Sequence, residues 1–419
     1  MNRLKVLVSA YACNPMSSLQ LHPGEDITGW RIVEQISRFH DVSVITHSYN
    51  RDGVDQALQK RPLSGVRFYF LDLPAWMRIL YKIEFAQRIY YYLWQIKAWR
   101  FARVLHRQVR FDLAHHVTFG NDWIPSFIGA LLPVPFIHGP VGGGQKTPKL
   151  LRKEYTLYGR FAETVRNVVQ WFGRKDYFRR RCLRRARAIL VCNRETRAKI
   201  PAKYSGKIFG FPVNGISTDE IRLNFSRPPS GELFRVLTAG RMHRLKGFAL
   251  AIRAFALFVR THPESEFVII GKGPEESRLR RLIRELELAH QVRMIPWLPR
   301  EKLLHAMFAS HVMVFPSFRD GGGAVVVEAM AVGKPVVCLD SGGPGFHVQP
   351  EWGIKIRPGK PDVVAEEISI ALERLSGNKE LRESLGRAAR KRVEEFYLWE
   401  KLGERLQEIY RLALDADLN

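Results

Sequence analysis

Apolar residues gather in short runs along most of the chain, and longer stretches with helical spacing lie between these runs. The runs form two sets, one before residue 195 and one after residue 232. They cover residues 4–10, 41–47, 66–73, 111–117, 134–139 and 188–193, then 234–240, 266–271, 292–296, 312–316 and 335–339. Near-continuous apolar strands separated by helices are typical of parallel sheets covered on both faces. We therefore predict an α/β fold with two parallel sheets, whose ligands bind beyond the carboxyl ends of the strands.

A polar stretch separates the two sets of strands. Residues 211–232 are rich in Pro, Gly, Asn and Ser, which indicates a linker and a loop, with a boundary near Asn214 and Gly215. Apolar positions at helical spacing continue from residue 379 to 414. We therefore predict a first domain at 1–215, a second at 216–395, and a terminal helix at 396–419 that packs back toward the first domain.

The composition places the chain among globular proteins. Its 419 residues, 46% of them hydrophobic, suffice for a large core and suggest two domains. Four scattered cysteines without a C-x-x-C pair favour a reducing compartment over a disulfide framework or a zinc site. The apolar stretch at the amino terminus is short, rich in β-branched residues and soon followed by a proline, so we predict a buried first strand. Ala10-Tyr11-Ala12 could nevertheless imitate a signal cleavage site.

Positive charge is concentrated in the first half of the chain. Of the formal +25, residues 1–215 contribute +21, from 35 Lys and Arg against 14 Asp and Glu. Residues 76–110 mix aromatic and basic side chains over helical lengths, and residues 174–188 add seven arginines and one lysine. Such segments suit an anionic membrane surface or nucleic acid, and a solvated helix face is the plainest alternative. No apolar run reaches the roughly 18 residues of a membrane-spanning helix.

Two carboxylates flank a glycine-rich turn in the second domain. Asp320 precedes three glycines, and Glu328 lies inside the helix predicted from residue 324, after the strand at 312–316. The glycines let the backbone approach a ligand, and the helix amino terminus offers unpaired N–H groups that suit a phosphate. The carboxylates can accept hydrogen bonds from hydroxyls, so a nucleotide sugar would satisfy both features. A turn with an acid that caps the helix is the simpler alternative.

Two cations follow an earlier strand of the same domain. Arg241 comes directly after the strand at 234–240, and Lys246 lies five residues further on. Together they could clamp a diphosphate, the arginine through its planar fork and the lysine as a point charge. Taken alone, such a pair is more often a solvated surface.

In combination, these motifs resemble a known family. "AGRMHRLKG", "IIGKGPE", "FPSFRDGGGAVVVEAMAVGKPVV" and "SGGPG" are similar to the nucleotide-binding half of the family 4 glycosyltransferases, over residues 235–400. "YACNP…GEDITGW", "AHHVTF" and "GPVGGGQKTP" resemble, more weakly, the amino-terminal domain of its bacterial polysaccharide-assembling members. The family has the GT-B fold of two facing Rossmann-like domains and retains the anomeric configuration of the transferred sugar.

The resemblance implies how the donor diphosphate would be held. Arg241 and Lys246 would neutralise its charge as the glycosidic bond breaks. The backbone amides of Gly322, Gly323 and Ala324 would complete the cradle. Fixed cations and amide dipoles at the leaving oxygen are the main catalytic resource for such a reaction, so no nucleophile, metal or cofactor is expected.

The resemblance also implies how the sugar and the nucleoside would be held. The family's two glutamates fall on Asp320 and Glu328, of which the first usually holds hydroxyls of the transferred sugar and the second holds the ribose. The base would lie near Gly271, Gly273 and residues 296–299. Because Asp320 is shorter than the usual glutamate, the sugar would sit differently or have another hydroxyl configuration.

In the first domain, a histidine pair and two glycine loops are candidates. His115 and His116 end a strand, so one side chain would enter the cleft and the other the core. In the resembled family a histidine here touches the donor sugar, and a buried structural histidine is the alternative. Gly142 and Gly143 would offer amides to an anion, unless they form a plain tight turn. Gly24, followed by two acids, would approach the donor or acceptor, with a surface loop as the alternative.

We therefore predict a retaining glycosyltransferase (a hexosyltransferase) that uses a nucleotide diphosphate sugar such as a UDP- or GDP-hexose. Its acceptor would be a glycan, linked to a polyprenyl diphosphate, at the cytoplasmic face of the inner membrane. The basic first domain would rest on that anionic surface and would bind no nucleic acid. Alternatives are a sugar-nucleotide epimerase on the same fold and a non-catalytic nucleic-acid-binding protein. The Asp415-Ala416-Asp417 sequence imitates a metal motif but lies in the terminal tail, so we expect no metal there.

Overall fold

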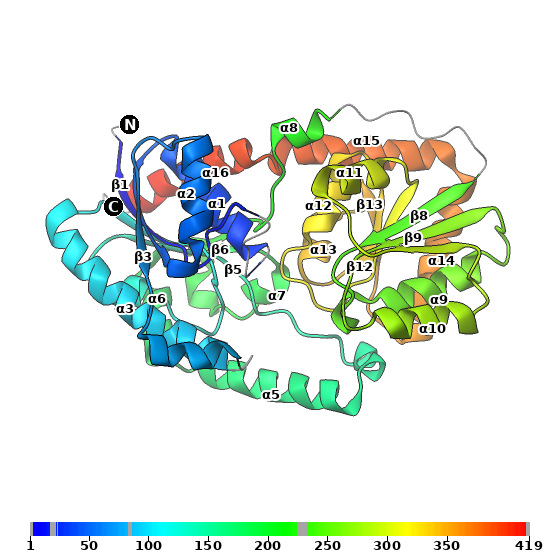
Figure 1. The fold of residues 1–419 in the computed structure, drawn as a ribbon, viewed down its shortest axis with the longest axis horizontal. Helices are drawn as coiled ribbons and strands as arrows, with labels where there is room; N and C mark the ends of the chain where they lie inside the picture. Colours follow the sequence, from blue (N-terminus) through cyan, green and yellow to red (C-terminus); the bar gives the residue numbers. More distant parts are fainter. Residues whose placement is uncertain (1–2, 17–21, 23, 83–85, 224–232, 416–419) are drawn as a thin grey trace. The chain divides into compact units, whose positions relative to one another are not determined.

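A computed structural model describes residues 3–16, 22, 24–82, 86–223 and 233–415 (Figure 1). The chain forms two compact units. The first contains residues 1–144, 165–213 and 399–419, and the second contains residues 145–164 and 214–398. The long segment of the second unit thus begins at the expected boundary. Residues 145–164, which we placed in the first domain, group with the second unit instead.

The first unit contains a sheet of seven parallel strands. They are β1 (Lys5–Ser9), β2 (Asp41–His47), β3 (Val66–Leu71), β4 (Leu113–His116), β5 (Phe136–Val141), β6 (Ala186–Val191) and β7 (Ile208–Gly210). Their order across the sheet is β3-β2-β1-β4-β5-β6-β7. Each of these strands except β7 lies within or overlaps one of the predicted apolar runs. The register pairs Val8 with His115 and Ser9 with His116, so the two histidines lie on opposite faces.

Helices cover both faces of this sheet. One core layer contains Val6 and Val8 of β1 with α1 (Glu25–Ser37), α2 (Arg51–Lys60) and the terminal helix α16 (Trp399–Asp415). The other contains Leu7 and Ala114 with α3 (Ala86–Val109), α4 (Phe127–Leu131) and α6 (Tyr177–Arg185). The predicted return of the last helix to the first domain is therefore confirmed. The shorter elements are η2 (Ser48–Asn50), η3 (Ala75–Lys82), α7 (Arg194–Arg197) and η5 (Ala202–Lys207).

The second unit contains a sheet of six parallel strands. They are β8 (Phe234–Ala239), β9 (Ser265–Ile270), β10 (Val292–Ile295), β11 (Val312–Phe315), β12 (Val336–Leu339) and β13 (Gly353–Ile356), in the order β10-β9-β8-β11-β12-β13. On one face lie α9 (Phe248–Phe258), α10 (Glu276–Glu285) and α14 (Pro361–Gly377). On the other lie α11 (Arg300–Phe308), α12 (Ala324–Ala331) and α15 (Lys379–Phe396). Leu151, in η4 (Leu150–Glu154), and Tyr155 belong to the first of these cores, which explains why residues 145–164 group here.

Both sheets have the same strand order relative to the chain. In each, the third, second and first strands are followed across the sheet by the fourth, fifth and sixth. This is the doubly wound order in which ligands bind where the strand order reverses, between the first and fourth strands. That point lies between β1 and β4 in the first unit and between β8 and β11 in the second. The predicted α/β class with two parallel sheets is confirmed.

The structure also bears on what we expected of the cysteines and of membrane-spanning helices. All four cysteines are free and buried. Of the helices formed by the described residues, none combines the length and the hydropathy that a membrane crossing requires.

Candidate functional site

The reversal point of the second sheet brings two predicted motifs together. Lys246 ends η6 (Arg244–Lys246), which follows β8, and Asp320 lies in the loop after the neighbouring strand β11. The loops are joined because the Phe318 amide donates to the Leu245 carbonyl oxygen over 2.7 Å. At Gly247 the backbone has φ 71°, and an added Cβ would lie 2.1 Å from the Pro316 carbonyl oxygen. Only glycine permits this approach, so the sequence itself fixes the junction.

A single carboxylate lies between an ammonium group and two backbone amides at this junction. Lys246 Nζ forms an ion pair with Asp320 Oδ2. Asp320 Oδ1 accepts hydrogen bonds from the amides of Gly322 (3.1 Å) and Gly323 (2.9 Å). Burial alone would raise the pKa of Asp320, but the Lys246 ammonium and the two amides hold it below its ordinary value. The junction therefore stabilises one negative charge.

This geometry changes the predicted phosphate cradle. Lys246 and the turn amides do converge, but the group they hold is the side chain of Asp320, so the amides of Gly322 and Gly323 are not bare. Gly323 has φ 63° and precedes Ala324, the first residue of α12, whose first amides have no acceptor within the helix. Arg241 follows the same strand as Lys246 and is exposed, and it forms no ion pair with any described residue.

Two predicted base-contacting glycines have a clear packing role. An added Cβ at Gly271 would lie 1.9 Å from the Gly240 carbonyl oxygen, and one at Gly273 would lie 2.3 Å from that of Met242. The loop after β9 thus packs directly on the loop after β8, and the Met242 amide donates to the Lys272 carbonyl oxygen over 2.8 Å. Within residues 296–299, Trp297 is 67% exposed.

Glu328 is held by an arginine that the sequence analysis did not single out. Arg300, the first residue of α11, places Nη1 2.6 Å from Glu328 Oε1 and also pairs with Glu220. Glu328 is buried on α12. Burial would lower the pKa of Arg300, but the two carboxylates raise it above its ordinary value. The only sequence signal was a cation four residues after the apolar run at 292–296, which is common on surfaces.

The glycine turn also rests on a buried histidine that sequence reasoning missed. His347, at the end of α13 (Gly342–His347), contacts the Gly322 carbonyl oxygen through Nε2 and the Tyr397 hydroxyl through Nδ1 (2.9 Å). Because a carbonyl oxygen can only accept, Nε2 carries the hydrogen and Nδ1 accepts from Tyr397. Burial lowers the pKa of His347 to about 4. The Gly343 amide donates to the Asp320 carbonyl oxygen over 2.9 Å, so the "SGGPG" motif also holds the glycine turn in place.

The reversal point of the first sheet is different. His115 places Nδ1 2.6 Å from the Tyr410 hydroxyl and Nε2 2.6 Å from the Gly139 carbonyl oxygen. His116 contacts the Tyr91 hydroxyl (3.1 Å) through Nε2 and Ser9 Oγ (3.3 Å) through Nδ1. Both side chains are fully buried, and burial lowers the pKa of His115 to about 4 and that of His116 well below its ordinary value. We expected one of the two side chains to enter a cleft, but both are buried and hydrogen-bonded inside the first unit.

The glycines of the first unit that we singled out lie in different surroundings. The Gly142 amide donates to the Gly120 carbonyl oxygen over 2.8 Å, so it is not open to the anion we expected there. Gly143 has φ 90°, and its carbonyl oxygen accepts a hydrogen bond from Gln170 Nε2 over 3.3 Å. Gly24 is exposed, with φ 95° and nothing within 4 Å of an added Cβ. Asp26, two residues later, is fully buried, which raises its pKa to about 6.

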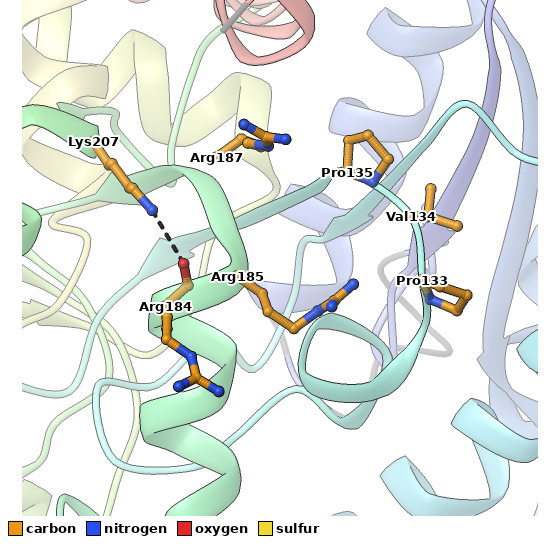
Figure 2. Close-up of a pocket in the computed structure, with 7 residues that line it drawn as sticks. All are labelled: Pro133, Val134, Pro135, Arg184, Arg185, Arg187 and Lys207. Atoms are coloured by element: carbon orange, nitrogen blue, oxygen red, sulfur yellow. Dashed lines mark hydrogen bonds between the residues drawn. The ribbon is translucent and has the colours of Figure 1, made fainter. Parts of the chain in front are cut away.

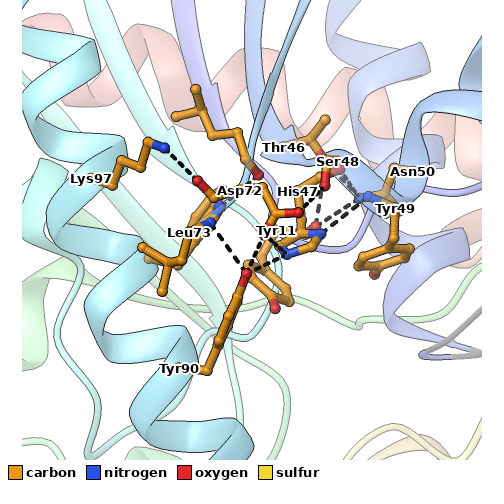
Figure 3. A network of polar contacts seen from close by, with 12 residues as sticks. Tyr11, Thr46, His47, Ser48, Tyr49, Asn50, Asp72, Leu73, Tyr90 and Lys97 are labelled. Carbon is orange, nitrogen blue, oxygen red and sulfur yellow. Dashed lines mark hydrogen bonds and ion pairs between the residues drawn. The ribbon is translucent and has the colours of Figure 1, made fainter. Parts of the chain in front are cut away.

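A polar network crosslinks the ends of β2 and β3 in the same unit (Figure 3). His47 Nδ1 accepts from the Tyr49 amide over 3.1 Å, so Nε2 carries the hydrogen and lies 3.2 Å from the Tyr90 hydroxyl. The Asp72 carboxylate accepts from Tyr90 and, over 2.8 Å, from Ser48 Oγ. Through Tyr90 the network connects the strand ends to α3, and no motif in the sequence predicted it.

A basic cavity of about 480 Å³ lies at the opposite end of the first sheet (Figure 2). It is lined by Pro133, Val134, Pro135, Arg184, Arg185, Arg187 and Lys207. Arg187 is the second residue of β6, and the others directly precede β5, β6 or β7. The cavity therefore lies at the amino ends of the strands and away from the edge where such sheets bind ligands. Several arginines of the basic run are used structurally here, since Arg181 and Arg185 donate to the carbonyl oxygens of Ala130 and Leu132, each over 2.7 Å.

Within the described ranges, no group of three or more His, Cys, Asp or Glu side chains is arranged to hold a metal ion. The imitation metal motif cannot be placed, because Ala416 and Asp417 lie outside those ranges.

Two family models match this chain, one over most of each half of the sequence. Residues 220–392 match the model of the glycosyl transferases group 1, and residues 29–207 match that of the glycosyl transferase 4-like domain. The chain belongs to the family 4 glycosyltransferases.

Individual members of this family show how far the likeness extends. The D-inositol 3-phosphate glycosyltransferase of Corynebacterium diphtheriae is 32% identical over 43% of this chain and 42% of its own length. A Corynebacterium glutamicum protein, named GDP-mannose-dependent monoacylated alpha-(1-6)-phosphatidylinositol monomannoside mannosyltransferase, is 30% identical over 39% of this chain and 43% of its own. The chain spans about half the length of the curated relatives it matches.

Among solved structures, that of Anabaena HepE in complex with UDP is similar to this chain over the whole length of HepE. The TM-score is 0.64 with 15% identity, covering 97% of this chain and 100% of the other. At this identity the likeness shows the fold alone, and the expected GT-B class is confirmed.

Proposed function

We propose that this protein transfers a hexose from a nucleoside diphosphate sugar to a glycan acceptor, with retention of anomeric configuration. The observation that carries the proposal is the convergence of Lys246 and the amides of Gly322 and Gly323 on one anionic group at the reversal point of the second sheet. A carboxylate occupies the position there, and a phosphate oxygen would make the same contacts. Family membership supports the proposal, as does a relative named for its dependence on GDP-mannose.

In the proposed reaction, donor binding moves the Asp320 carboxylate away from Lys246. The diphosphate then pairs with the Lys246 ammonium in place of Asp320. The exposed Arg241, which also follows β8, moves to contact the diphosphate. The bond between the anomeric carbon and the phosphate oxygen breaks, the anomeric carbon bonds to the acceptor oxygen, and the leaving phosphate takes the acceptor's proton. Fixed cations oppose the charge that builds on the leaving oxygen, so this step requires no metal ion.

Other residues hold the rest of the donor. Glu328 would accept hydrogen bonds from the ribose hydroxyls through the carboxylate oxygen that Arg300 leaves open, because Arg300 contacts Oε1. Released from Lys246, Asp320 would accept hydrogen bonds from the sugar hydroxyls. The donor is a UDP- or GDP-hexose, which is supported by the complex of HepE with UDP and by the relative named as GDP-mannose-dependent.

We further propose that the acceptor is lipid-linked and that the protein works at the cytoplasmic face of the inner membrane. The net +21 of residues 1–215 favours an anionic surface over a neutral one. The relative named for a phosphatidylinositol monomannoside supports a glycan attached to lipid.

The double substitution Arg241→Ala and Lys246→Ala tests the reaction. We expect release of nucleoside diphosphate from the donor to fall at least about 100-fold, since one lost transition-state donor alone typically costs about that much. Stabilisation by UDP, GDP or ADP in thermal unfolding would identify the base and should disappear in the variant.

The matched control is Arg293→Ala with Lys379→Ala, two exposed cations of the same unit. Unchanged turnover in the first variant would reject the proposed clamp. A labelled donor separates transfer from epimerisation, because an isomerised donor without free nucleoside diphosphate contradicts transfer.

A further inference from the structure

Helix α5 (Leu157–Gly173) presents an apolar face to solvent. Seven large apolar side chains on this helix are exposed, from Leu157 at 82% to Val165 at 38%. They are Leu157, Tyr158, Phe161, Val165, Val168, Trp171 and Phe172. Their spacing of three, four and seven residues places them on one face of a helix. Single exposed apolar residues are ordinary, but a continuous row of seven marks an interaction surface.

The side of α5 that contacts the rest of the protein carries buried polar residues. Glu163 is buried and forms an ion pair with Arg319. Gln170, also buried, donates to the Gly143 carbonyl oxygen, and Arg166 contacts the same oxygen at 3.5 Å. A surface helix of a globular protein normally has the reverse arrangement, with apolar residues toward the core. Val169, at the border of the apolar face, packs against the core of the first unit, but none of the seven exposed residues belongs to either core.

Basic residues accompany this face. Residues 146–187, which contain α5, carry fourteen Lys and Arg against three acidic residues. Lys175 Nζ lies 3.4 Å from the centre of the Trp171 ring, so a cation sits directly at the end of the apolar row. An apolar face with aromatic residues and flanking cations is complementary to the acyl chains and anionic headgroups of a bilayer.

The size of the face argues against a second protein as its main partner. A helix of 17 residues is about 25 Å long and about 10 Å wide, so its footprint is about 250 Å². A stable protein interface needs about 800 Å² from each partner. A bilayer has no such minimum, because a helix lying in its interface is surrounded by lipid along its whole length.

We infer that α5 docks the protein on an anionic membrane, with its axis in the plane of the interface and the row from Leu157 to Phe172 inserted among the acyl chains. This inference names the element behind the membrane association in the proposed function and rests on that part of it. The predicted contact segment at 76–110 differs, because Tyr90, Tyr91 and Trp94 of α3 lie in the core of the first unit.

Vesicle binding tests the inference with two matched triple variants. Phe161→Ser, Val168→Ser and Phe172→Ser, on residues that are 67%, 49% and 62% exposed, remove the apolar face. Val363→Ser, Ile370→Ser and Leu412→Ser, on residues that are 45%, 62% and 45% exposed, remove comparable side chains from α14 and α16. The measurement is co-sedimentation with vesicles of phosphatidylcholine containing about 30% phosphatidylglycerol, and with phosphatidylcholine alone.

We expect the wild type to partition onto the anionic vesicles and the α5 variant to bind at least about tenfold more weakly, with the control variant within about twofold of the wild type. Equal binding by the α5 variant, or no binding by the wild type, would overturn the inference. So would a wild-type dimer that the α5 substitutions convert to a monomer without change in vesicle binding, since the face would then bind a second copy.

Tryptophan quenching locates the inserted residues. Lipids brominated on their acyl chains should quench Trp171, so Trp171→Phe should remove quenching that Trp297→Phe, at another exposed tryptophan, leaves unchanged. Turnover of donor with a soluble acceptor distinguishes the two proposals. It should be equal in the wild type and the α5 variant, and absence of turnover in both would reject the proposed function while leaving the membrane result standing.

Discussion

The reversal points of the two sheets have the same topology and opposite chemistry. Between β8 and β11, Lys246 and Asp320 form a charged junction at the strand ends. Between β1 and β4, His115 and His116 are fully buried and hydrogen-bonded within the core. Strand order thus creates the place for a ligand in each unit, and the residues at the strand ends and in the following loops decide whether that place is charged.

The two units nevertheless share one structural device. His115 joins the Gly139 carbonyl oxygen to the Tyr410 hydroxyl, and His347 joins that of Gly322 to Tyr397 in the same way. In the first unit the device fixes a strand to the terminal helix. In the second it fixes the turn that carries the candidate anion site.

Acid should weaken both devices, and this is the largest effect we expect. The pKa of each histidine is lowered to about 4 in the folded protein, so between about pH 6.5 and 4 the unfolded chain binds more protons. Stability contributed by the neutral imidazoles is therefore complete above pH 6.5 and is lost as the pH falls to 4. Each contributes on the order of 3 kcal/mol.

Urea unfolding at pH 7, 6, 5 and 4 measures this loss. His290→Gln, at an exposed histidine that takes part in neither contact, is the control variant. A free energy of unfolding that stays constant over this range would show that the two histidines are not kept neutral.

Replacing the histidines one at a time separates their consequences. His115→Phe leaves the Tyr410 hydroxyl and the Gly139 carbonyl oxygen without their partner, and we expect the free energy of unfolding to fall by about 3 kcal/mol. His347→Phe should cost about as much and should also weaken binding of nucleoside diphosphate, because Gly322 belongs to the turn. Calorimetric titration of the folded variants checks this. If His115→Phe weakened donor binding as much as His347→Phe, the contrast between the two units would be wrong.

Arg300→Gln should have a smaller effect that is confined to the second unit. It leaves the buried Glu328 carboxylate without its cation, and we expect affinity for the nucleoside diphosphate to fall about tenfold, or about 1.4 kcal/mol. Arg293→Gln, whose side chain is 59% exposed and pairs with Glu266, is the control. A change in turnover without a change in diphosphate affinity would contradict a role in positioning Glu328.

Asp320→Asn should produce the smallest change and the most informative one. The amide oxygen of asparagine can still accept from the Gly322 and Gly323 amides, but it carries no charge to compete for Lys246. We expect affinity for free nucleoside diphosphate to rise roughly threefold while turnover of the sugar donor falls, since weak, partly exposed ion pairs are worth about 1 kcal/mol or less. Weaker diphosphate binding would mean that the carboxylate assists the site instead of occupying it.

Two helices show where inference from the sequence was sound and where it was not. The mixture of aromatic and basic residues at 76–110 predicted a membrane contact, but α3 turns Tyr90, Tyr91 and Trp94 into the core. The apolar spacing of α5 is typical of a core-facing helix, yet that face is exposed. Periodicity identifies a helix and its apolar side, but it does not say which neighbour covers that side. Only the buried contacts of Glu163 and Gln170 reveal the orientation of α5.

By itself, the sequence determined the α/β class, the two sets of strands, the domain boundary near Asn214 and the motifs around Lys246 and Asp320. These depend on local periodicity, on glycine at positions such as Gly247 where a side chain would collide, and on order along the chain. The tertiary structure decided that Asp320 fills the predicted cradle, that Arg300 and His347 support it, and that His115 is buried. Those outcomes depend on residues far apart in sequence meeting in space, and a hydrogen bond or an ion pair leaves no periodic trace in the chain.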